Sequence, residues 1–485
     1  MRSYLLVLFL LVPSAFAEDD LEPLVRRFTE AYAIVEQNAA DPVSSEQAFY
    51  QGAIPGMLRR LDPHSVFFDP DQFEQLRKLE TSTQKGFGSV VSVLPGRVIV
   101  LQTLPGTPSA KSGIAPGDEI LAINGYQLSR LDMEQLVALL GQSRQQQARL
   151  DVKRPSRAGI LRFVLTPEEM QSPSVERAFL LKPGVGYLKV TSFDEKTGAQ
   201  IREGIEKLGG RNLKGLVLDL RNNPGGVLTA AIETAGLFLK PGQKIVTVRG
   251  RSVAEKTEVV PDKVTPYGFP LAVLINGKSA SASEIVAGAL QDHDRATVVG
   301  EPSFGKGLVE SVYPLSNGTG LALTTALYYT PSGRSIQRPL DTAQFALAEK
   351  ASHLNSQSVF KTDTGRQVTG GGGIVPDEVV FPAPVTRLRA VLDASGSFTT
   401  YATNYLRDHK VTDDFEVTPA LLDDFQVFLA QHGIQPGVSE WSGEREFIRN
   451  RLKTEIFNQA LGVAKGDEVE AERDPQIQKA LEILK

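Results

Sequence analysis

The sequence predicts a multidomain protein with α/β and α+β parts, and three observations lead to this prediction. Strand–turn–helix units repeat between residues 185 and 300. Short strands alternate with turns at 85–167, and helical periodicity flanks both regions at 18–84 and 386–485. With 485 residues, the chain is long enough for about three domains.

Residues 1–17 have the three parts of a secretory signal peptide. Arg2 supplies the positive start, Tyr4–Val12 the apolar segment, and Ala15-Phe16-Ala17 the cleavage site. The apolar segment is too short to span a bilayer as a helix. We therefore expect an exported protein, periplasmic or secreted, and the alternative is an uncleaved anchor.

Composition argues against several kinds of site. Lys and Arg are spread along a chain of net charge -5, so no nucleic-acid surface is expected. The chain has no cysteine, which excludes disulfides and thiol chemistry. Its five histidines form no HExxH pattern, so we expect neither a metal site nor a cofactor.

Residues 18–84 are predicted to be helical. Ser44 and Gln47 have the spacing of a capping box, which would open a second helix through Met57 and Leu58. Before it, apolar residues recur at helical spacing, and one expectation is that they cap the core: Leu21, Leu24, Val25, Phe28, Ala31, Tyr32 and Val35.

Residues 85–167 are predicted to form a peptide-binding domain. The sequence GTPSAKSGIAPGDEILAING is similar to the centre of PDZ domains. Such a domain takes a peptide as an added strand and holds its terminal carboxylate on loop amides. Gly86-Phe87-Gly88 stands where that loop should be, and Phe87 could line the pocket for the last side chain. The alternative for these three residues is a plain hairpin.

The stretch from residue 271 to 310 is best suited to chemistry. A buried strand, a turn of small residues, a helix, a second strand and a glycine-flanked lysine are predicted in this order: Leu271–Ile275, Ser279–Ser283, Glu284–Leu290, Thr297–Val299 and Gly305-Lys306-Gly307.

Ser281 on this turn is a candidate nucleophile. A turn before a helix exposes a hydroxyl, and the helix amides can face a developing negative charge. A base must take the hydroxyl proton. His293 would lie roughly 18 Å away along one helix, so it is excluded as a local partner. Lys306 is the better base, and the alternative is that Ser281 or Ser283 is only an N-cap.

A second glycine-rich turn lies earlier in the chain. Leu216–Leu220 is a predicted buried strand that leads into Arg221–Gly226, and a helix is predicted at Leu228–Leu237. Amides at such a turn can stabilise an oxyanion, although the glycines could serve packing alone. Because the same order recurs at Ser281, we expect both turns at one edge of an α/β core.

Two regions follow the core motifs. Residues 338–372 contain a helix-like stretch, Thr342–Leu354, and end in a glycine run, 370–373, that is typical of a flexible hinge. Residues 386–485 are predicted to be helical, with one helix opened by Thr418-Pro419 and ended by Gly433, and a last helix opened by Asp474-Pro475.

Six motifs occur in a fixed order between residues 20 and 385, and together they resemble the carboxy-terminal processing peptidases, a family of Ser–Lys endoproteases. They are LDPHS (61–65), PGDEILAING (116–125), DLRNNPGG (219–226), SASASEIVAGALQD with GEPSFGKG (279–307), YYTPSGRSIQ (328–337) and GIVPD (373–377).

The resemblance implies a serine endopeptidase with a crotonase/ClpP-like core at 168–385 and an inserted PDZ domain at 85–167. It assigns the nucleophile to Ser281, the base to Lys306, and the oxyanion-hole amides to Gly226 and Ala282. The substrates would be unfolded or C-terminal segments of other exported proteins, cut by acyl transfer without a cofactor. It also implies a homo-oligomer paired through the helical termini, whereas no signal points to a particular activating partner.

Glu310 departs from the family pattern, which has glutamine at this position to orient the lysine. An ionised glutamate would favour the charged lysine and oppose its function as a base. Two alternatives therefore stay open beside the protease: a catalytically weak peptide-binding scaffold and a relative that binds apolar ligands.

Overall fold

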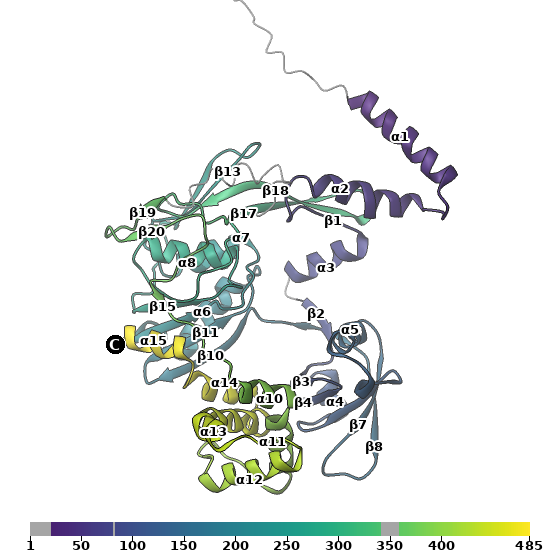
Figure 1. Ribbon diagram of the computed structural model, residues 1–485. Coiled ribbons are helices and arrows are strands. Elements are labelled where there is room, and N and C mark those ends of the chain that lie inside the picture. Colours follow the sequence, from purple (N-terminus) through teal and green to yellow (C-terminus); the bar gives the residue numbers. More distant parts are fainter. Residues whose placement is uncertain (1–20, 81–82, 341–357) are drawn as a thin grey trace, which may run out of the picture.

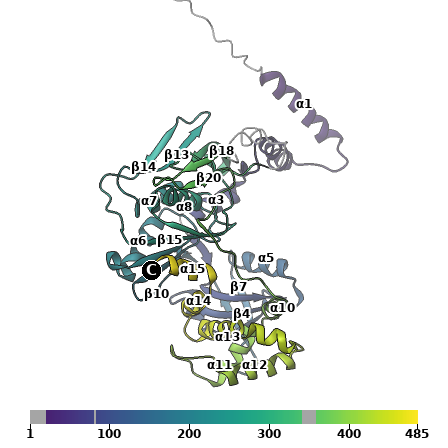
Figure 2. The same ribbon diagram turned by 60° about the vertical axis from the view of Figure 1, so that its left-hand side comes forward.

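The structure of the protein is a computed structural model that describes residues 21–80, 83–340 and 358–485 (Figure 1). The predicted signal peptide at 1–17 and the predicted helix at Thr342–Leu354 lie outside these ranges. Within them, each helix is too short or too polar to cross a bilayer. The two views of the chain agree that its body consists of a sheet region and a lower region, which holds the strands between residues 85 and 167 and the C-terminal helices (Figures 1 and 2).

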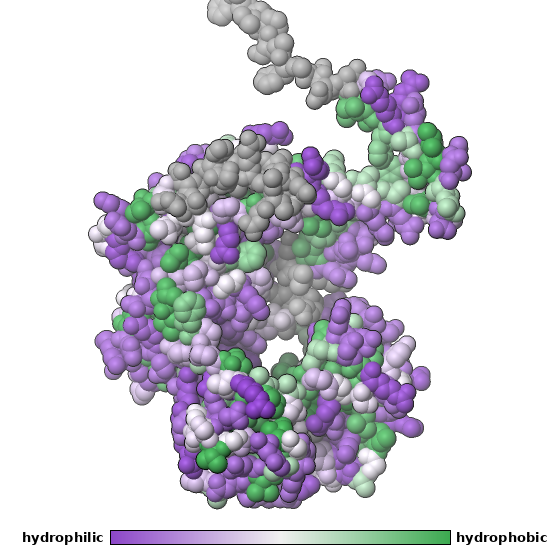
Figure 3. Space-filling model, in the orientation of Figure 1, coloured by the Kyte–Doolittle hydropathy of each residue, from purple (hydrophilic) through white to green (hydrophobic). Residues whose placement is uncertain are grey.

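The first helix, α1 (Leu21–Asn38), has an exposed apolar stripe. None of its residues is buried, and it projects from the body of the molecule (Figures 1 and 3). Its aromatic contacts are those of Phe28 and Tyr32, whose rings lie 5.5 and 5.2 Å from the ring of Phe49. The expectation that this stripe caps the core is therefore wrong.

The second predicted helix begins where its cap indicates. The Gln47 amide donates to the hydroxyl of Ser44 at 3.2 Å, and the helix follows. The elements of this region are η1 (Gln47–Ala53), α2 (Ile54–Leu58), β1 (Val66–Phe68) and α3 (Pro70–Glu80).

The next region is a compact antiparallel sheet in the order β3-β4-β5-β7-β8, with β6 paired to β5. Its long helix, α5, opens with a capping box in which Asp132 accepts from the Gln135 amide at 2.8 Å. The two-stranded ribbon β2–β9 joins it to the rest of the chain. The elements are β2 (Thr83–Gly86), β3 (Ser89–Leu94), β4 (Arg97–Thr103), α4 (Pro108–Ser112), β5 (Glu119–Ile123), β6 (Tyr126–Gln127), η2 (Leu128–Arg130), α5 (Met133–Ser143), β7 (Ala148–Lys153), β8 (Ile160–Leu165) and β9 (Glu168–Gln171).

The central sheet has the order β10-β11-β12-β15-β16-β21 and is parallel from β11 onward. Helices α6, α7 and α8 pack with one face of its strands, and the C-terminal helix α15 (Pro475–Ile483) packs with the other, so the central strands are buried on both sides. The elements are β10 (Val175–Lys182), β11 (Val185–Val190), α6 (Thr197–Leu208), η3 (Gly210–Asn212), β12 (Gly215–Asp219), α7 (Leu228–Gly236), β15 (Leu271–Ile275), α8 (Ala282–Asp292), β16 (Thr297–Gly300) and β21 (Glu378–Val379).

A second sheet lies beside the first. It has the order β1-β18-β13-β14, and β17 pairs with β18. Because β1 pairs with β18, the LDPHS segment just before β1 is brought to this sheet. The elements are β13 (Lys244–Gly250), β14 (Lys256–Val259), β17 (Leu308–Pro314), η4 (Ser316–Gly318), β18 (Gly320–Tyr329), and a separate pair, β19 (Val359–Lys361) and β20 (Gln367–Thr369).

The glycine run at 370–373 is not a free hinge, and that prediction is wrong. The amides of Gly371 and Gly373 donate to the carbonyls of Ser335 and Ile336, at 2.7 and 2.9 Å. A Cβ on Gly373 would lie 2.7 Å from the carbonyl oxygen of Ser303. Glycine serves close backbone approach here.

The C-terminal helices build their own core and contact both other regions. Arg97 donates to Thr400 at 3.1 Å, and the Val463 amide donates to Gln102 at 3.0 Å, which joins them to the PDZ-like sheet. The elements are α10 (Arg387–Ser395), α11 (Ser397–Asp408), α12 (Pro419–Gln431), α13 (Val438–Ala460), α14 (Val463–Ala471) and α15 (Pro475–Ile483). Thr418 and Asp474 cap α12 and α15, as the sequence predicts.

Candidate active site

Three turns leave the same edge of the central sheet. In the parallel pairing, Asp219 at the end of β12 lies beside Leu274, and Ile275 at the end of β15 lies beside Gly300. The segments that follow these strands, 220–227, 276–281 and 301–307, therefore start side by side. The carboxyl edge of a parallel sheet is the usual place for a ligand or reaction site.

The turn after β15 places Ser281 directly before α8. Its backbone has φ 54° and ψ -114°, a conformation that non-glycine residues rarely adopt. Neighbouring bonds hold it there: the Ala280 amide and the Ser283 hydroxyl both donate to the carbonyl of Asn223, at 3.0 and 2.9 Å. Strain of this kind persists where the surrounding structure imposes it, and it is concentrated at functional sites.

The glycine-rich turn after β12 packs directly against this serine turn. Gly225 and Gly226 have φ values of +100° and +143°. A Cβ on Gly225 would lie 2.9 Å from the Ala282 nitrogen, and a Cβ on Gly226 would lie 2.0 Å from the Phe193 carbonyl oxygen. Only glycine fits such an approach, so both glycines are needed to bring this turn next to Ser281 and Ala282.

The loop that carries Lys306 is held by residues of the YYTPSGRSIQ motif and by Arg338, the residue that follows it. The Gly307 amide donates to the Gln337 side chain at 2.8 Å, and the Arg338 amide donates to the Gly305 carbonyl at 2.9 Å. The hydroxyl of Tyr328 donates to the carbonyl of Lys306 at 2.6 Å and reaches that of Ser281 at 3.2 Å. The serine turn and the lysine loop thus share a buried tyrosine.

Lys306 and Glu310 are in contact. The amine nitrogen lies 2.7 Å from a carboxylate oxygen of Glu310, and each side chain is 22% exposed. That oxygen receives no hydrogen bond of good geometry, so the contact is an ion pair rather than an aligned hydrogen bond. The predicted proximity of these two side chains is therefore observed.

A single cavity of about 830 Å³ joins the residues selected from the sequence. It is lined by Ser281, Ala282, Gly226, Lys306 and Glu310. Apolar side chains form much of its remaining wall, and they come from β1, β17, α7, α8 and the segment after β11: Val66, Phe68, Val312, Leu228, Ile285 and Phe193. An extended chain with apolar side chains would fit such a wall.

His64 also lines this cavity, and the sequence analysis gave it no role. Burial, and then the positive charge of Lys306, lower the pKa of His64. The signal for it is the LDPHS motif, but only the pairing of β1 with β18 brings that motif to the site. His293, the histidine nearest to Ser281 in sequence, bonds Asp363 and the Lys244 carbonyl at the far end of α8.

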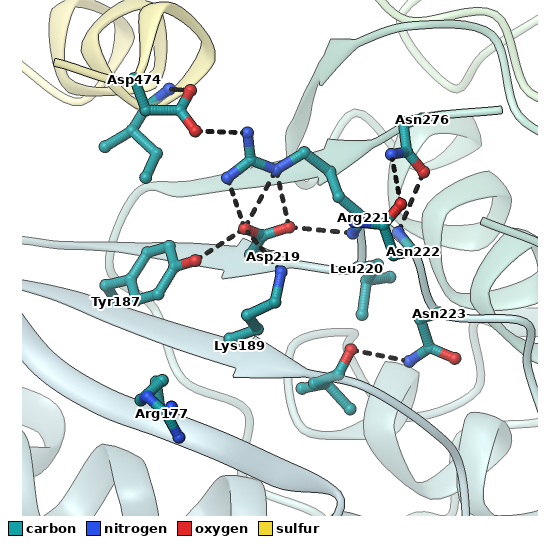
Figure 4. A network of polar contacts seen from close by, with 12 residues as sticks. Arg177, Tyr187, Lys189, Asp219, Leu220, Arg221, Asn222, Asn223, Asn276 and Asp474 are labelled. Atoms are coloured by element: carbon teal, nitrogen blue, oxygen red, sulfur yellow. Dashed lines mark hydrogen bonds and ion pairs between the residues drawn. The ribbon is translucent and has the colours of Figure 1, made fainter. Parts of the chain in front are cut away.

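Arg221, Asn222 and Asn223, at the start of the glycine-rich turn, make polar contacts with the neighbouring elements (Figure 4). Arg221 donates to buried Asp219 and to Asp474 at 2.6 Å, which ties the end of β12 to the cap of α15. Burial alone would raise the pKa of Asp219, but Arg221 holds that pKa below its usual value. Asn223 accepts from the Gly225 amide and donates to the Val190 carbonyl, each at 2.9 Å.

The Gly86-Phe87-Gly88 segment begins at the last residue of β2 and ends directly before β3. Gly88 has φ +75°, and a Cβ there would lie 2.3 Å from Thr107. Phe87 packs against the core of this sheet, and its carbonyl accepts from the Ser109 amide at 2.9 Å. The segment is therefore a fixed turn at the start of the edge strand β3. In the described part of the chain, no group of His, Asp and Glu side chains is suited to hold a metal ion.

Two family models match the sequence: peptidase family S41 over residues 184–342 and a PDZ domain over residues 99–154. The carboxy-terminal-processing protease of Bartonella bacilliformis is 38% identical over 306 residues, which cover 61% of this chain and 68% of that protein. The carboxyl-terminal-processing protease of Synechocystis sp. is 32% identical over 361 residues, covering 72% and 84%. Among solved structures, the photosystem II D1 C-terminal processing protease matches at 25% identity with a TM-score of 0.40, covering 74% of this chain and 88% of that one.

Proposed function

Because this chain belongs to the carboxy-terminal processing proteases of peptidase family S41, we propose that Ser281 and Lys306 form its catalytic dyad. The observation that carries the proposal is the shared cavity, which both side chains line together with Gly226 and Ala282. A protease of this family acts on protein or peptide substrates, and a cavity of about 830 Å³ accommodates several residues of an extended chain.

The proposed reaction is acyl transfer. Lys306, in its neutral form, takes the proton of the Ser281 hydroxyl as its oxygen attacks the peptide carbonyl. The amides of Gly226 and Ala282 donate to the oxyanion, and the start of α8 adds its partial positive charge. The lysine then gives its proton to the leaving amine. A water molecule hydrolyses the ester, with the lysine again as base, and restores Ser281.

The other modules fit this activity. The crotonase/ClpP-like description of residues 168–385 is supported by parallel strands buried between helices on both sides. We assign residues 85–167 to capture of a substrate tail, with Gly86, Phe87 and Gly88 at the carboxylate and β3 as the strand that the tail extends. The signal peptide predicted from the sequence at 1–17 supports export to the periplasm, where unfolded exported proteins would be substrates. The exposed stripe of α1 supports pairing with a second copy.

One observation favours the alternative of a catalytically weak peptide-binding scaffold. The ion pair between Lys306 and Glu310 stabilises the charged amine, which cannot accept a proton. Measuring the cleavage of a substrate therefore distinguishes a protease from a scaffold. Only a protease cleaves the substrate and stops doing so when Ser281 is replaced.

The test is cleavage of an unfolded protein substrate by the purified full-length chain and three variants: Ser281→Ala, Lys306→Ala and the double variant. We expect each single change to lower kcat by about 10³-fold or more, and the double variant to be no slower than the singles, because the two groups act as one unit. Melting curves check that the variants fold. Cleavage by Ser281→Ala at the wild-type rate would overturn the proposal.

A further inference from the structure

The Glu284 carboxylate lies between the two proposed catalytic residues. It is fully buried in the first turn of α8. One oxygen accepts from the backbone amides of Ser281 and Lys306, both at 2.9 Å. The other accepts from the Gly305 amide at 2.7 Å and from the Ser303 hydroxyl at 2.5 Å. One side chain thus joins the serine turn to the lysine loop.

These four partners are all donors, and this fixes the form of Glu284 that suits the site. An ionised carboxylate offers only acceptors, so it can satisfy all four at once. A protonated carboxyl group or a glutamine amide turns part of the group into a donor that faces other donors. The network is therefore complete only with the ionised glutamate.

Ser303 completes the arrangement from the outer side. Its buried hydroxyl donates to Glu284 and accepts from the Ile374 amide at 2.6 Å. Its backbone is fixed as well, because its amide donates to the Ile374 carbonyl at 3.0 Å and its carbonyl accepts from Arg338 at 3.1 Å. Ser303 therefore holds the outer oxygen of Glu284 in place.

We propose that Glu284 and Ser303 are positioning residues that set the separation and orientation of Ser281 and Lys306. This inference rests on the proposed Ser–Lys function. Neither residue touches the substrate in this assignment. They act through the backbone of the dyad, where small errors in geometry lower the rate strongly.

The charges around Glu284 give the inference a pH signature. Burial raises the pKa of Glu284 to about 7. The four hydrogen bonds that its carboxylate accepts act in the opposite direction, because they favour its ionised form. The titratable groups of the adjoining elements are Lys306, Glu310 of β17, Tyr328 of β18 and His64 before β1. Removing the Ser303 donor takes support from the ionised form, so the pKa of Glu284 rises further. Activity that needs this carboxylate ionised would then be lost at a higher pH.

The experiment measures kcat, KM and the pH dependence of kcat/KM on one peptide for the full-length wild type, Ser303→Ala and Glu284→Gln. We expect Glu284→Gln to lower kcat at least about tenfold while KM stays within about twofold, because the substrate contacts remain. For Ser303→Ala we expect the acid limb to move to higher pH by about half a unit or more. Ser143→Ala and Glu455→Gln, buried groups in α5 and α13, are the matched controls and should leave both readouts unchanged.

The inference is overturned if Ser303→Ala and Glu284→Gln retain the wild-type kcat and pH profile. It is also overturned if kcat and the pH profile change as much in the two control variants as in Ser303→Ala and Glu284→Gln. Should Glu284→Gln fail to fold, the pH profile of Ser303→Ala decides alone. Ser281→Ala in the same series separates the two claims. If it still turns over, the dyad is wrong, whereas if it is inactive and the two variants behave as wild type, only the positioning role fails.

Discussion

At the scale of single residues, the proposed acyl transfer depends on the position and protonation of the Lys306 amine. Lys306 lies 2.7 Å from the Glu310 carboxylate, at the start of the strand that forms one wall of the cavity. The negative charge favours the protonated amine, whereas the proposed reaction needs the neutral one. In the proposed reaction, Glu310 would therefore orient the lysine and at the same time oppose its use as a base.

Glu310→Gln keeps the size and reach of this side chain and removes its charge. We predict that kcat/KM near neutral pH rises about threefold, because the uncharged side chain no longer forms the ion pair that favours the charged amine. The measurement is a pH–rate profile of both proteins on one peptide. Superimposable profiles would show that the glutamate does not couple to the base, and an inactive variant would show that the carboxylate has a catalytic task of its own.

Sequence reasoning identified some residues of the site and missed others for a physical reason. Ser281 and Lys306 stand in local motifs, and Glu310 follows Lys306 by four residues. His64 and Glu284 also stand in motifs, LDPHS and SASASE, but these motifs do not indicate their roles, because the roles depend on contacts made by the fold. His64 arrives only through the β1–β18 pairing, and Glu284 reads as an ordinary residue in the first turn of a helix.

At the scale of elements, the site is made by turns at the ends of β12, β15 and β16. The strands and helices were predictable, because buried strands and glycine-rich turns have strong local signals. The close packing of these turns was not. A sequence shows that Gly226 is glycine, but only the structure shows that a Cβ there would meet the Phe193 carbonyl at 2.0 Å.

The turn before β3 gives a prediction for the PDZ domain. A peptide with an apolar last residue and a free carboxylate should bind the inactive full-length Ser281→Ala chain about tenfold more tightly than its amidated form, because amidation removes charged hydrogen bonds. Titration calorimetry with the two peptides measures this difference.

Two glycine variants refine that measurement. Gly88 and Gly125 both have positive φ, but a Cβ meets Thr107 at 2.3 Å only at Gly88, and nothing lies within 4 Å at Gly125. Gly88→Ala should therefore abolish the preference for the free carboxylate, and Gly125→Ala should keep it. If the Ser281→Ala chain with an unchanged PDZ domain bound the free and the amidated peptide with equal affinity, capture of the tail carboxylate would be refuted.

At the scale of the whole molecule, the C-terminal helices join the other parts. They contact the PDZ domain through Arg97 and Gln102, and α15 returns to the central sheet, where Asp474 meets Arg221 (Figure 4). The caps and apolar faces of these helices were predicted from the sequence. Their packing partners were not, because an amphipathic face does not identify the surface that covers it.

The same limit explains the two wrong expectations. The apolar stripe of α1 predicts a helix correctly, yet it lies exposed instead of capping the core. The glycines at 370–373 suggested a hinge, yet the segment is fixed, and a Cβ on Gly370 or Gly373 would meet the carbonyl oxygen of Ser335 or Ser303. In both segments the sequence pattern was identified correctly. What the pattern does in the fold depends on whether other parts of the chain pack against it, which the pattern alone does not show.

The central claim is that Ser281 is a nucleophile activated by Lys306. Its most direct test is covalent labelling of the full-length protein by a fluorophosphonate, followed by mass spectrometry of the labelled peptide. We predict a single labelled site at Ser281, slow labelling in Lys306→Ala and none in Ser281→Ala. A label that remains in Ser281→Ala, or a wild-type protein that turns over substrate while Ser281 stays unlabelled, would contradict this account.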